Sequence, residues 1–134
     1  MKTVLVFGTF DLLHPGHKYF LKQAKKLGNF LIVVVAREQT VKKIKGFKPT
    51  QTERERKNNL KKNNYVDRVV MGNLKNPYYI IKKIKPDIIA LGYDQNSFTA
   101  NLPQALKTLQ LTPKIIRLKP FFPDRFKTSI IKNT

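Results

Sequence analysis

The run Phe30–Ala36 constrains the fold of this chain more than any other segment. It is apolar at every position, with no alternation of polar and apolar side chains. A strand with this pattern is buried on both faces, which is typical of a parallel sheet covered by helices. The segment therefore favours an α/β protein over an antiparallel sheet with one solvated face.

Strand-like and helix-like segments alternate along the rest of the chain. Further strands are expected at 3–7, 66–71, 87–91 and 114–118, and helices at 15–27, 77–85, 102–111 and 128–132. Another helix should run to about residue 63, opened by a capping box of Thr50 with Glu53 or of Thr52 with Glu55. The basic stretch 41–50 contains Gly46 and Pro49, which predicts a loop that could include a helical turn.

This alternation predicts the fold class. We expect a single Rossmann-like, doubly wound domain over residues 1–134, with a five-stranded parallel sheet flanked by helices. The fifth helix, near residues 128–132, would close the chain.

The composition narrows the class of protein. The chain carries 27 Lys and Arg against 8 Asp and Glu, and its net charge of +19 attracts anions such as nucleotides. A solvated lysine-rich surface explains the same charge about equally well. The chain has no cysteine, which excludes disulfides and thiolate chemistry. Its apolar runs are far shorter than the roughly 20 residues that cross a bilayer, so we expect a cytoplasmic protein with no membrane partner.

Both histidines of the chain lie in one tetrapeptide, His14-Pro15-Gly16-His17, soon after the first strand. Pro15 suits the first position of a helix, and the N–H groups of a helix N-terminus attract phosphate. Gly16 lets a phosphate approach the backbone, and the imidazoles can donate hydrogen bonds to its oxygens. The tetrapeptide therefore predicts a phosphate-transfer site. A metal site made by the protein alone and a chance pair of loop histidines are the weaker readings.

Ligands of doubly wound sheets bind beyond the carboxyl ends of the strands. Three segments should meet there: 9–17, 37–48 and 92–96.

Several charged residues in and near these segments are candidates for a role. Lys43, Lys45 and Lys48 could reach the phosphates, and Lys45 is the one that we assign to catalysis. Asp11 either holds a metal ion through water or braces its loop. Arg56 either turns toward the site or lies on a solvated helix face.

The segment 8–17, Gly-Thr-Phe-Asp-Leu-Leu-His-Pro-Gly-His, resembles the signature of the cytidylyltransferase-like family of nucleotidyltransferases. The resemblance covers nearly the whole chain. It implies in-line attack by an acceptor phosphate on the α-phosphorus of a nucleoside triphosphate, with Mg²⁺ or another divalent cation on the β and γ phosphates. It also implies a homodimer. The residues placed at the nucleotide are Thr9, Phe10, His14, Pro15, Gly16, His17, Asp94, Phe121 and Ser129.

Within the family, segments 35–46 and 86–95 are similar to those of archaeal FAD synthases. That resemblance implies transfer of AMP from ATP to FMN, which gives FAD and pyrophosphate. Tyr78, Tyr79, Phe121 and Phe122 are expected in the core or at an interface rather than against the flavin.

Two alternatives stay open. The first is a cytidylyltransferase that uses CTP with glycerol 3-phosphate or another phosphorylated alcohol or sugar. Arg56 fits one of the two arginines that glycerol-phosphate cytidylyltransferases carry, but Asn64 stands at the other position. The second is a basic nucleic-acid-binding module. The net charge favours it, but no basic tail or aromatic ribonucleoprotein-type motif accompanies the charge, so no specific nucleic-acid partner is expected.

Overall fold

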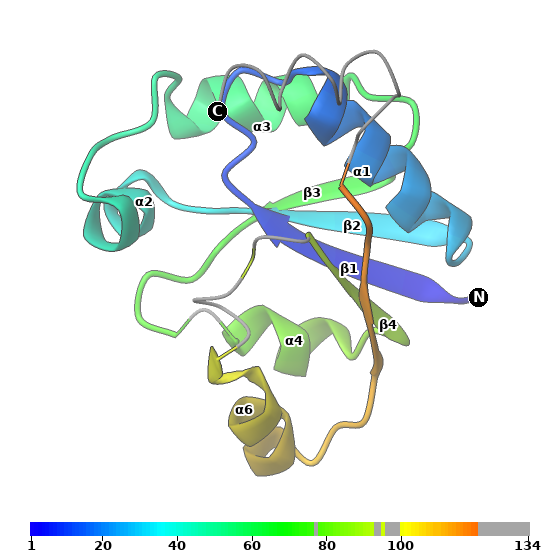
Figure 1. Ribbon diagram of the computed structural model, residues 1–134. Helices are drawn as coiled ribbons and strands as arrows, with labels where there is room; N and C mark the ends of the chain where they lie inside the picture. Colours follow the sequence, from blue (N-terminus) through cyan, green and yellow to red (C-terminus); the bar gives the residue numbers. More distant parts are fainter. Residues whose placement is uncertain (77, 93–94, 96–99, 121–134) are drawn as a thin grey trace.

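The computed structural model describes residues 1–76, 78–92, 95 and 100–120 (Figure 1). The elements follow in the order β1 (Thr3–Gly8), α1 (Pro15–Lys26), β2 (Phe30–Val35), α2 (Glu38–Lys45), α3 (Glu53–Lys61), β3 (Arg68–Met71), α4 (Tyr79–Ile84), β4 (Ile88–Leu91), α6 (Leu102–Leu109) and β5 (Lys114–Arg117). The helix predicted at 128–132 lies outside the described residues. In the described part of the chain, no helix has the length and apolar character needed to cross a membrane.

The five strands form one parallel sheet in the order β3-β2-β1-β4-β5, as the sequence predicts. Strands β2 and β3 lie in turn on one side of β1. Strands β4 and β5 lie in turn on its other side. The order therefore reverses between β1 and β4, and ligands of doubly wound sheets bind at this switch point. The loop after β1 starts there.

Helices cover both faces of the sheet, which explains the uninterrupted apolar run of β2. In Figure 1, α1 and α3 lie on one side of the sheet and α4 and α6 on the other. The helical residues buried against the two faces are Leu21, Ala24 and Leu60 on the first side, and Ile80, Ile81, Leu102 and Leu106 on the second. Each fully buried aliphatic side chain contributes roughly 1.5–3 kcal/mol.

The prediction of a loop over residues 41–50 was wrong in its first half, because α2 extends from Glu38 to Lys45. Val41 is buried and anchors this helix to the core. The carboxylate of Glu53 accepts a hydrogen bond from Glu38 N at 2.6 Å, which satisfies a free donor at the helix N-terminus. Gly46 ends the helix with a left-handed backbone, at φ 84°. We expected Gly46 to mark a loop, whereas it caps a helix.

At the start of α3 and the end of α1, the capping residues predicted from the sequence lie at or next to the observed helix ends. Of the two capping boxes possible for α3, the structure contains the one between Thr52 and Glu55. Gly28 follows the C-cap residue Leu27 of α1. A Cβ atom on Gly28 would lie 2.7 Å from Lys2 O, so the position needs a glycine because the amino end of β1 passes so close.

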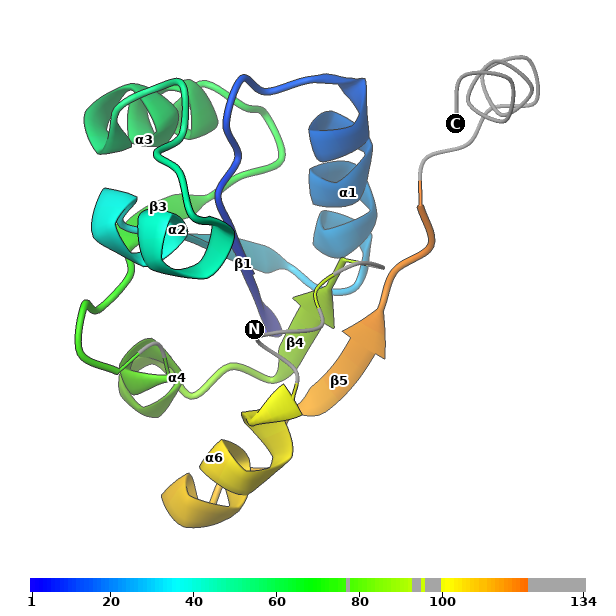
Figure 2. The ribbon, with the colours of Figure 1, turned by 60° about the vertical axis from the view of Figure 1, so that its left-hand side comes forward.

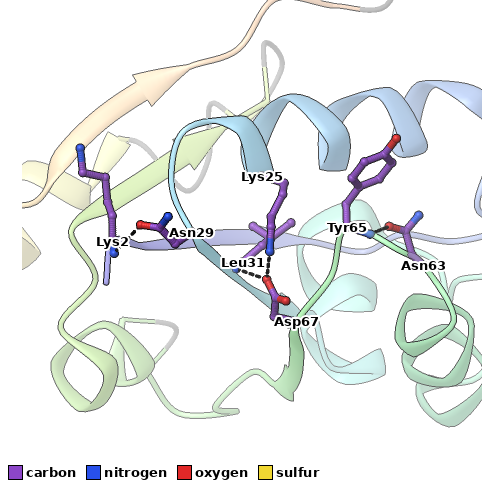
Figure 3. A network of polar contacts seen from close by, with 7 residues as sticks. All are labelled: Lys2, Lys25, Asn29, Leu31, Asn63, Tyr65 and Asp67. Carbon is purple, nitrogen blue, oxygen red and sulfur yellow. Dashed lines mark hydrogen bonds and ion pairs between the residues drawn. The ribbon is translucent and has the colours of Figure 1, made fainter.

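Polar side chains bind backbone amides near the amino edge of the sheet, far from the expected site (Figure 3). Asp67 pairs with Lys25 Nζ and accepts a hydrogen bond from Leu31 N at 2.8 Å. Burial alone would raise the pKa of the Asp67 carboxyl. The hydrogen bonds from Lys25 and Leu31 and the charge of Lys25 outweigh that effect, so its pKa lies below the ordinary value of 3.8.

We expect Asp67→Asn to lower the free energy of unfolding at neutral pH by about 1 kcal/mol, because the ion pair with Lys25 is lost. A carboxyl whose pKa is lower in the folded state stabilises the protein above its unfolded pKa, here 3.8. That contribution disappears as the pH falls through the folded pKa. Urea unfolding across this range should therefore show the wild type approaching the variant in acid. Asp87→Asn is the control, since the Asp87 carboxylate accepts an amide hydrogen bond from Thr3 N and has no ion pair with any described residue. A constant difference between wild type and Asp67→Asn at all pH values would contradict this account.

Candidate active site

The candidate site is built on residues 9–14, which join β1 to α1 and are called the histidine loop below. In Figure 2 this loop rises from the end of β1 between α3 and α1. Both histidines lie at its far end, at the N-terminus of α1. The sequence-predicted tetrapeptide is therefore at the carboxyl edge of the sheet.

His14 is the N-cap of α1, a position that Ser, Thr, Asp and Asn usually occupy. Its Nδ1 accepts hydrogen bonds from Gly16 N at 3.0 Å and from His17 N at 3.3 Å. His17 Nδ1 in turn accepts from His14 N at 3.4 Å, which completes a capping box made of two imidazoles. Pro15 is the first helical residue, as predicted, and needs no partner for the N–H that it lacks.

These hydrogen bonds fix which nitrogen of each imidazole faces the helix. Because Nδ1 of both rings accepts, the proton of each neutral imidazole is on Nε2. The two rings stack with centroids 3.7 Å apart and planes 20° apart, so the two Nε2 atoms are held as a pair. His14 is exposed. The arrangement offers N–H donors beside the positive end of a helix dipole, which suits the oxygens of a phosphate chain.

Gly16 is close to the capping imidazole. A Cβ atom at this position would lie 2.9 Å from Cε1 and 3.1 Å from Nδ1 of His14. The sequence predicted that Gly16 lets a phosphate approach the backbone. The structure adds that Gly16 makes room for the ring of His14.

Gly16→Ala should therefore displace the His14 ring and weaken the cap. We expect the free energy of unfolding to fall by about 1 kcal/mol, the usual effect of losing an N-cap, even though alanine favours a helix. Urea denaturation would measure the change. The control is Gly46→Ala. A Cβ atom at Gly46 would meet no atom of the described residues within 4 Å, so its cost comes from the left-handed backbone. A Gly16→Ala protein as stable as the wild type would show that the ring moves without cost.

The histidine loop has a strained backbone. Phe10 and Leu12 both have φ of 53°, in the left-handed region that side chains disfavour by about 1–2 kcal/mol per residue. Phe10 is buried and packs edge-on against His17, with ring centroids 5.6 Å apart. The predicted contact of Phe10 with the nucleotide would therefore involve its backbone. Thr9 is half-buried beside it.

Asp11 braces the loop against a distant segment, which is one of the two roles predicted for it. Its two carboxylate oxygens accept from Thr50 N at 2.7 Å and from Gln51 N at 2.9 Å. Burial alone would raise the pKa of Asp11. Its hydrogen bonds from Thr50 and Gln51 and the nearby charge of Arg56 act in the opposite direction, and the resulting pKa is below the ordinary value.

Arg56 of α3 is completely buried, which excludes the solvated helix face as its environment. Its Nη1 donates to Thr9 O at 2.9 Å and to Ala36 O at 2.8 Å, and its Nε donates to Gln51 O at 3.3 Å. Burial lowers the pKa of the guanidinium, and Asp11, Glu53 and Glu38 counteract this. Arg56 thus ties the residues after β1 and β2 to the start of α3. Its Nη2 makes no hydrogen bond to any residue that the structure describes.

At the switch point, Gln95 connects the two central strands. Its Nε2 donates to Phe7 O at 2.8 Å, and its Oε1 accepts from Gly92 N at 2.7 Å. Arg117 of β5 donates through Nη1 to Gly92 O at 2.6 Å. These bonds fix Gly92 and Gln95 at the carboxyl ends of β1 and β4. Asp94, Phe121, Phe122 and Ser129 lie outside the described residues.

Lys45 lies in the last turn of α2, and Lys43 and Lys48 flank it. All three side chains are exposed. The role assigned to Lys45 remains a prediction. Sequence reasoning did not single out Gln51 or Gln95. Gln95 lies in the predicted segment 92–96, but each glutamine contacts a residue far away in the chain, which no local pattern reveals.

Comparison with known proteins gives consistent results. A model of the cytidylyltransferase-like family matches residues 5–134. An FAD synthase of Pyrococcus horikoshii is 46% identical over 130 residues, which cover 96% of this chain and 88% of that protein. An FAD synthase of Methanohalobium evestigatum is 44% identical over 115 residues, or 86% of this chain and 75% of that protein.

Solved structures show the same fold. The crystal structure of a lipopolysaccharide core biosynthesis protein from Thermoplasma volcanium superposes with a TM-score of 0.85 at 38% identity. It covers 91% of this chain and 99% of that one. Together with the family model, which spans the histidine loop and both histidines, these likenesses identify the protein family. The chain belongs to the cytidylyltransferase-like family of nucleotidyltransferases.

Proposed function

We propose that this chain is an FAD synthase, which transfers AMP from ATP to FMN and releases pyrophosphate. The observation that carries the proposal is the double-imidazole cap at the N-terminus of α1, found in a chain 41–46% identical to five FAD synthases. Such a cap binds phosphates but does not select the base or the acceptor. The choice of ATP and FMN rests on those relatives.

In this mechanism a phosphate oxygen of FMN attacks the α-phosphorus of ATP. The new bond joins that oxygen to the α-phosphorus, and the bond from the α-phosphorus to the bridging oxygen breaks, so that pyrophosphate leaves. Negative charge accumulates on the α-phosphate and on the leaving group. The Nε2 groups of His14 and His17 and the positive end of the α1 dipole stabilise this charge, because they are already oriented when the substrate arrives. Lys45 neutralises the outer phosphates.

The divalent cation arrives as part of the substrate, MgATP or its equivalent. In the described part of the chain, no group of three or more His, Cys, Asp or Glu side chains is arranged to hold a metal ion. Both oxygens of Asp11 already accept backbone hydrogen bonds. We therefore propose that the ion is bound mainly by the β and γ phosphates, with positioning but no ligand cage from the protein.

The test is pyrophosphate release by the purified protein with Mg²⁺. ATP with FMN should give pyrophosphate and FAD in equal amounts, whereas CTP with glycerol 3-phosphate should give neither. Turnover of the second pair alone would overturn the choice of substrates and favour the cytidylyltransferase alternative. Turnover of neither pair would contradict the FAD synthase proposal itself.

We also propose a homodimer, as is common in the family. A groove of about 900 Å³ between the β2–β3 side of the sheet and α4 supports the proposal. Met1, Leu74 and Tyr79 at this groove are 88%, 55% and 50% exposed, which is unusual for large apolar side chains. The groove also carries Arg37, Arg68, Lys75 and Lys83. Two copies facing each other here would repel through these cations.

We therefore expect the dimer to form more readily at about 0.5 M than at about 0.05 M salt, because salt screens this repulsion. Sedimentation velocity at both salt concentrations would measure it, with Tyr79→Ser to remove an apolar contact without adding charge. Ile115→Ser is the matched control: Ile115 is a 41% exposed apolar residue on β5, outside the groove. A protein that is monomeric under both conditions would contradict the dimer.

A further inference from the structure

The histidine loop is attached to residues 50–51 by hydrogen bonds in both directions. Asp11 accepts from the two consecutive amides of Thr50 and Gln51, at 2.7 and 2.9 Å. The side chain of Gln51 returns the contact, since its Oε1 accepts from Leu12 N at 2.9 Å. The two segments are about 40 residues apart in the sequence. These three bonds are called the loop clasp below.

The loop clasp holds a backbone that would not keep its shape alone. The residues on either side of Asp11, Phe10 and Leu12, both have a left-handed backbone without being glycine. Such conformations persist only where the surroundings enforce them. Phe10 is held by burial, whereas Leu12 is 53% exposed, so packing cannot hold it. The hydrogen bond from Leu12 N to Gln51 Oε1 is therefore the contact that holds the backbone of Leu12 directly, beside the two bonds of Asp11.

Leu12 is two residues before His14. A change in the backbone at Leu12 would move the N-cap residue, and with it the stacked imidazole pair. We propose that Gln51 is a positioning residue of the active site: through its hydrogen bond to Leu12 N it sets the orientation of His14 and His17. It need not contact the substrate to do so. This inference rests on the proposed function for its catalytic consequence, but the structural part does not.

The inference predicts a specific kinetic pattern. Gln51→Ala should lower kcat for FAD formation about 10-fold, because small misplacements of catalytic groups are costly, while KM for ATP changes less than about 2-fold. Gln51→Glu keeps an oxygen that can accept from Leu12 N and should recover most of the lost kcat. The matched control is Gln104→Ala, an exposed glutamine on α6 that should leave both constants unchanged.

A second readout needs no substrate. The chain has only two histidines, so NMR of the imidazoles gives two assignable sets of signals. Both should shift in Gln51→Ala and return toward their wild-type positions in Gln51→Glu, and the Leu12 amide should exchange faster with solvent in Gln51→Ala. Unchanged imidazole signals in Gln51→Ala, or an equal loss of kcat in the Ala and Glu variants, would overturn the inference. If the wild type makes no FAD, the proposed function fails, and the NMR signals still decide the role of Gln51.

Discussion

Replacing His14 with alanine is expected to lower kcat for FAD formation by about 10²–10³-fold, the usual effect of removing one preorganised donor to a developing negative charge. The same change should lower the free energy of unfolding by about 1 kcal/mol, because His14 also caps α1 through Gly16 N and His17 N. In the proposed mechanism one side chain therefore has two separable functions. The Nδ1 atom of His14 caps the helix, and its Nε2 atom is proposed to stabilise the charge that develops in the reaction.

His14→Asn separates these functions. Asparagine is among the best N-cap residues, so this variant should unfold close to the wild-type urea concentration. Its short side chain cannot place a donor where Nε2 of His14 stood, so kcat should stay as low as in His14→Ala. Steady-state kinetics would compare kcat of the two variants, and urea unfolding would compare their midpoints. An Asn variant with wild-type kcat would show that His14 acts only as a cap.

The sequence alone predicted the parts of this protein that depend on neighbouring residues. The start of α1 at Pro15 is a local signal and was predicted, whereas the capping role of the two imidazoles was not. The parallel sheet followed from the apolar run of β2. The doubly wound order followed from the alternation of strands and helices. Each of these signals is contained in a short stretch of sequence.

The parts that were missed depend on contacts across the fold. Helix α2 was expected as a loop because its only buried anchor is Val41 and its N-terminus is satisfied by Glu53, 15 residues away. Gln95 donates a hydrogen bond to the carbonyl of Phe7, which is 88 residues away in the sequence. Gln51 accepts one from the amide of Leu12, which is 39 residues away. No spacing rule connects such pairs. Arg56 was ambiguous for the same reason, since its partners come from three different segments.

Replacing Arg56 with methionine should cause the largest loss of stability among the variants considered. Methionine fills a similar volume but donates no hydrogen bonds, so the carbonyl oxygens of Thr9, Ala36 and Gln51 would lose this donor. Leaving a buried carbonyl without a partner costs about 1–3 kcal/mol, so the free energy of unfolding should fall by about 3 kcal/mol or more. Small domains have only about 5–15 kcal/mol in total, so the variant would be marginally stable.

Arg54→Met is the matched control for this experiment. Arg54 lies two residues earlier on the same helix, is exposed, and its replacement changes the net charge equally. Arg54→Met should change the free energy of unfolding by no more than about 0.5 kcal/mol. If Arg56→Met does not fold, Arg56→Lys keeps the charge and one or two of the hydrogen bonds, and should give an intermediate urea midpoint. Should Arg56→Met and Arg54→Met unfold at the same urea concentration, the buried guanidinium would not be what joins α3 to the ends of β1 and β2. The stability of the histidine loop would then have to come from the burial of Phe10 and the hydrogen bonds of Asp11 and Gln51.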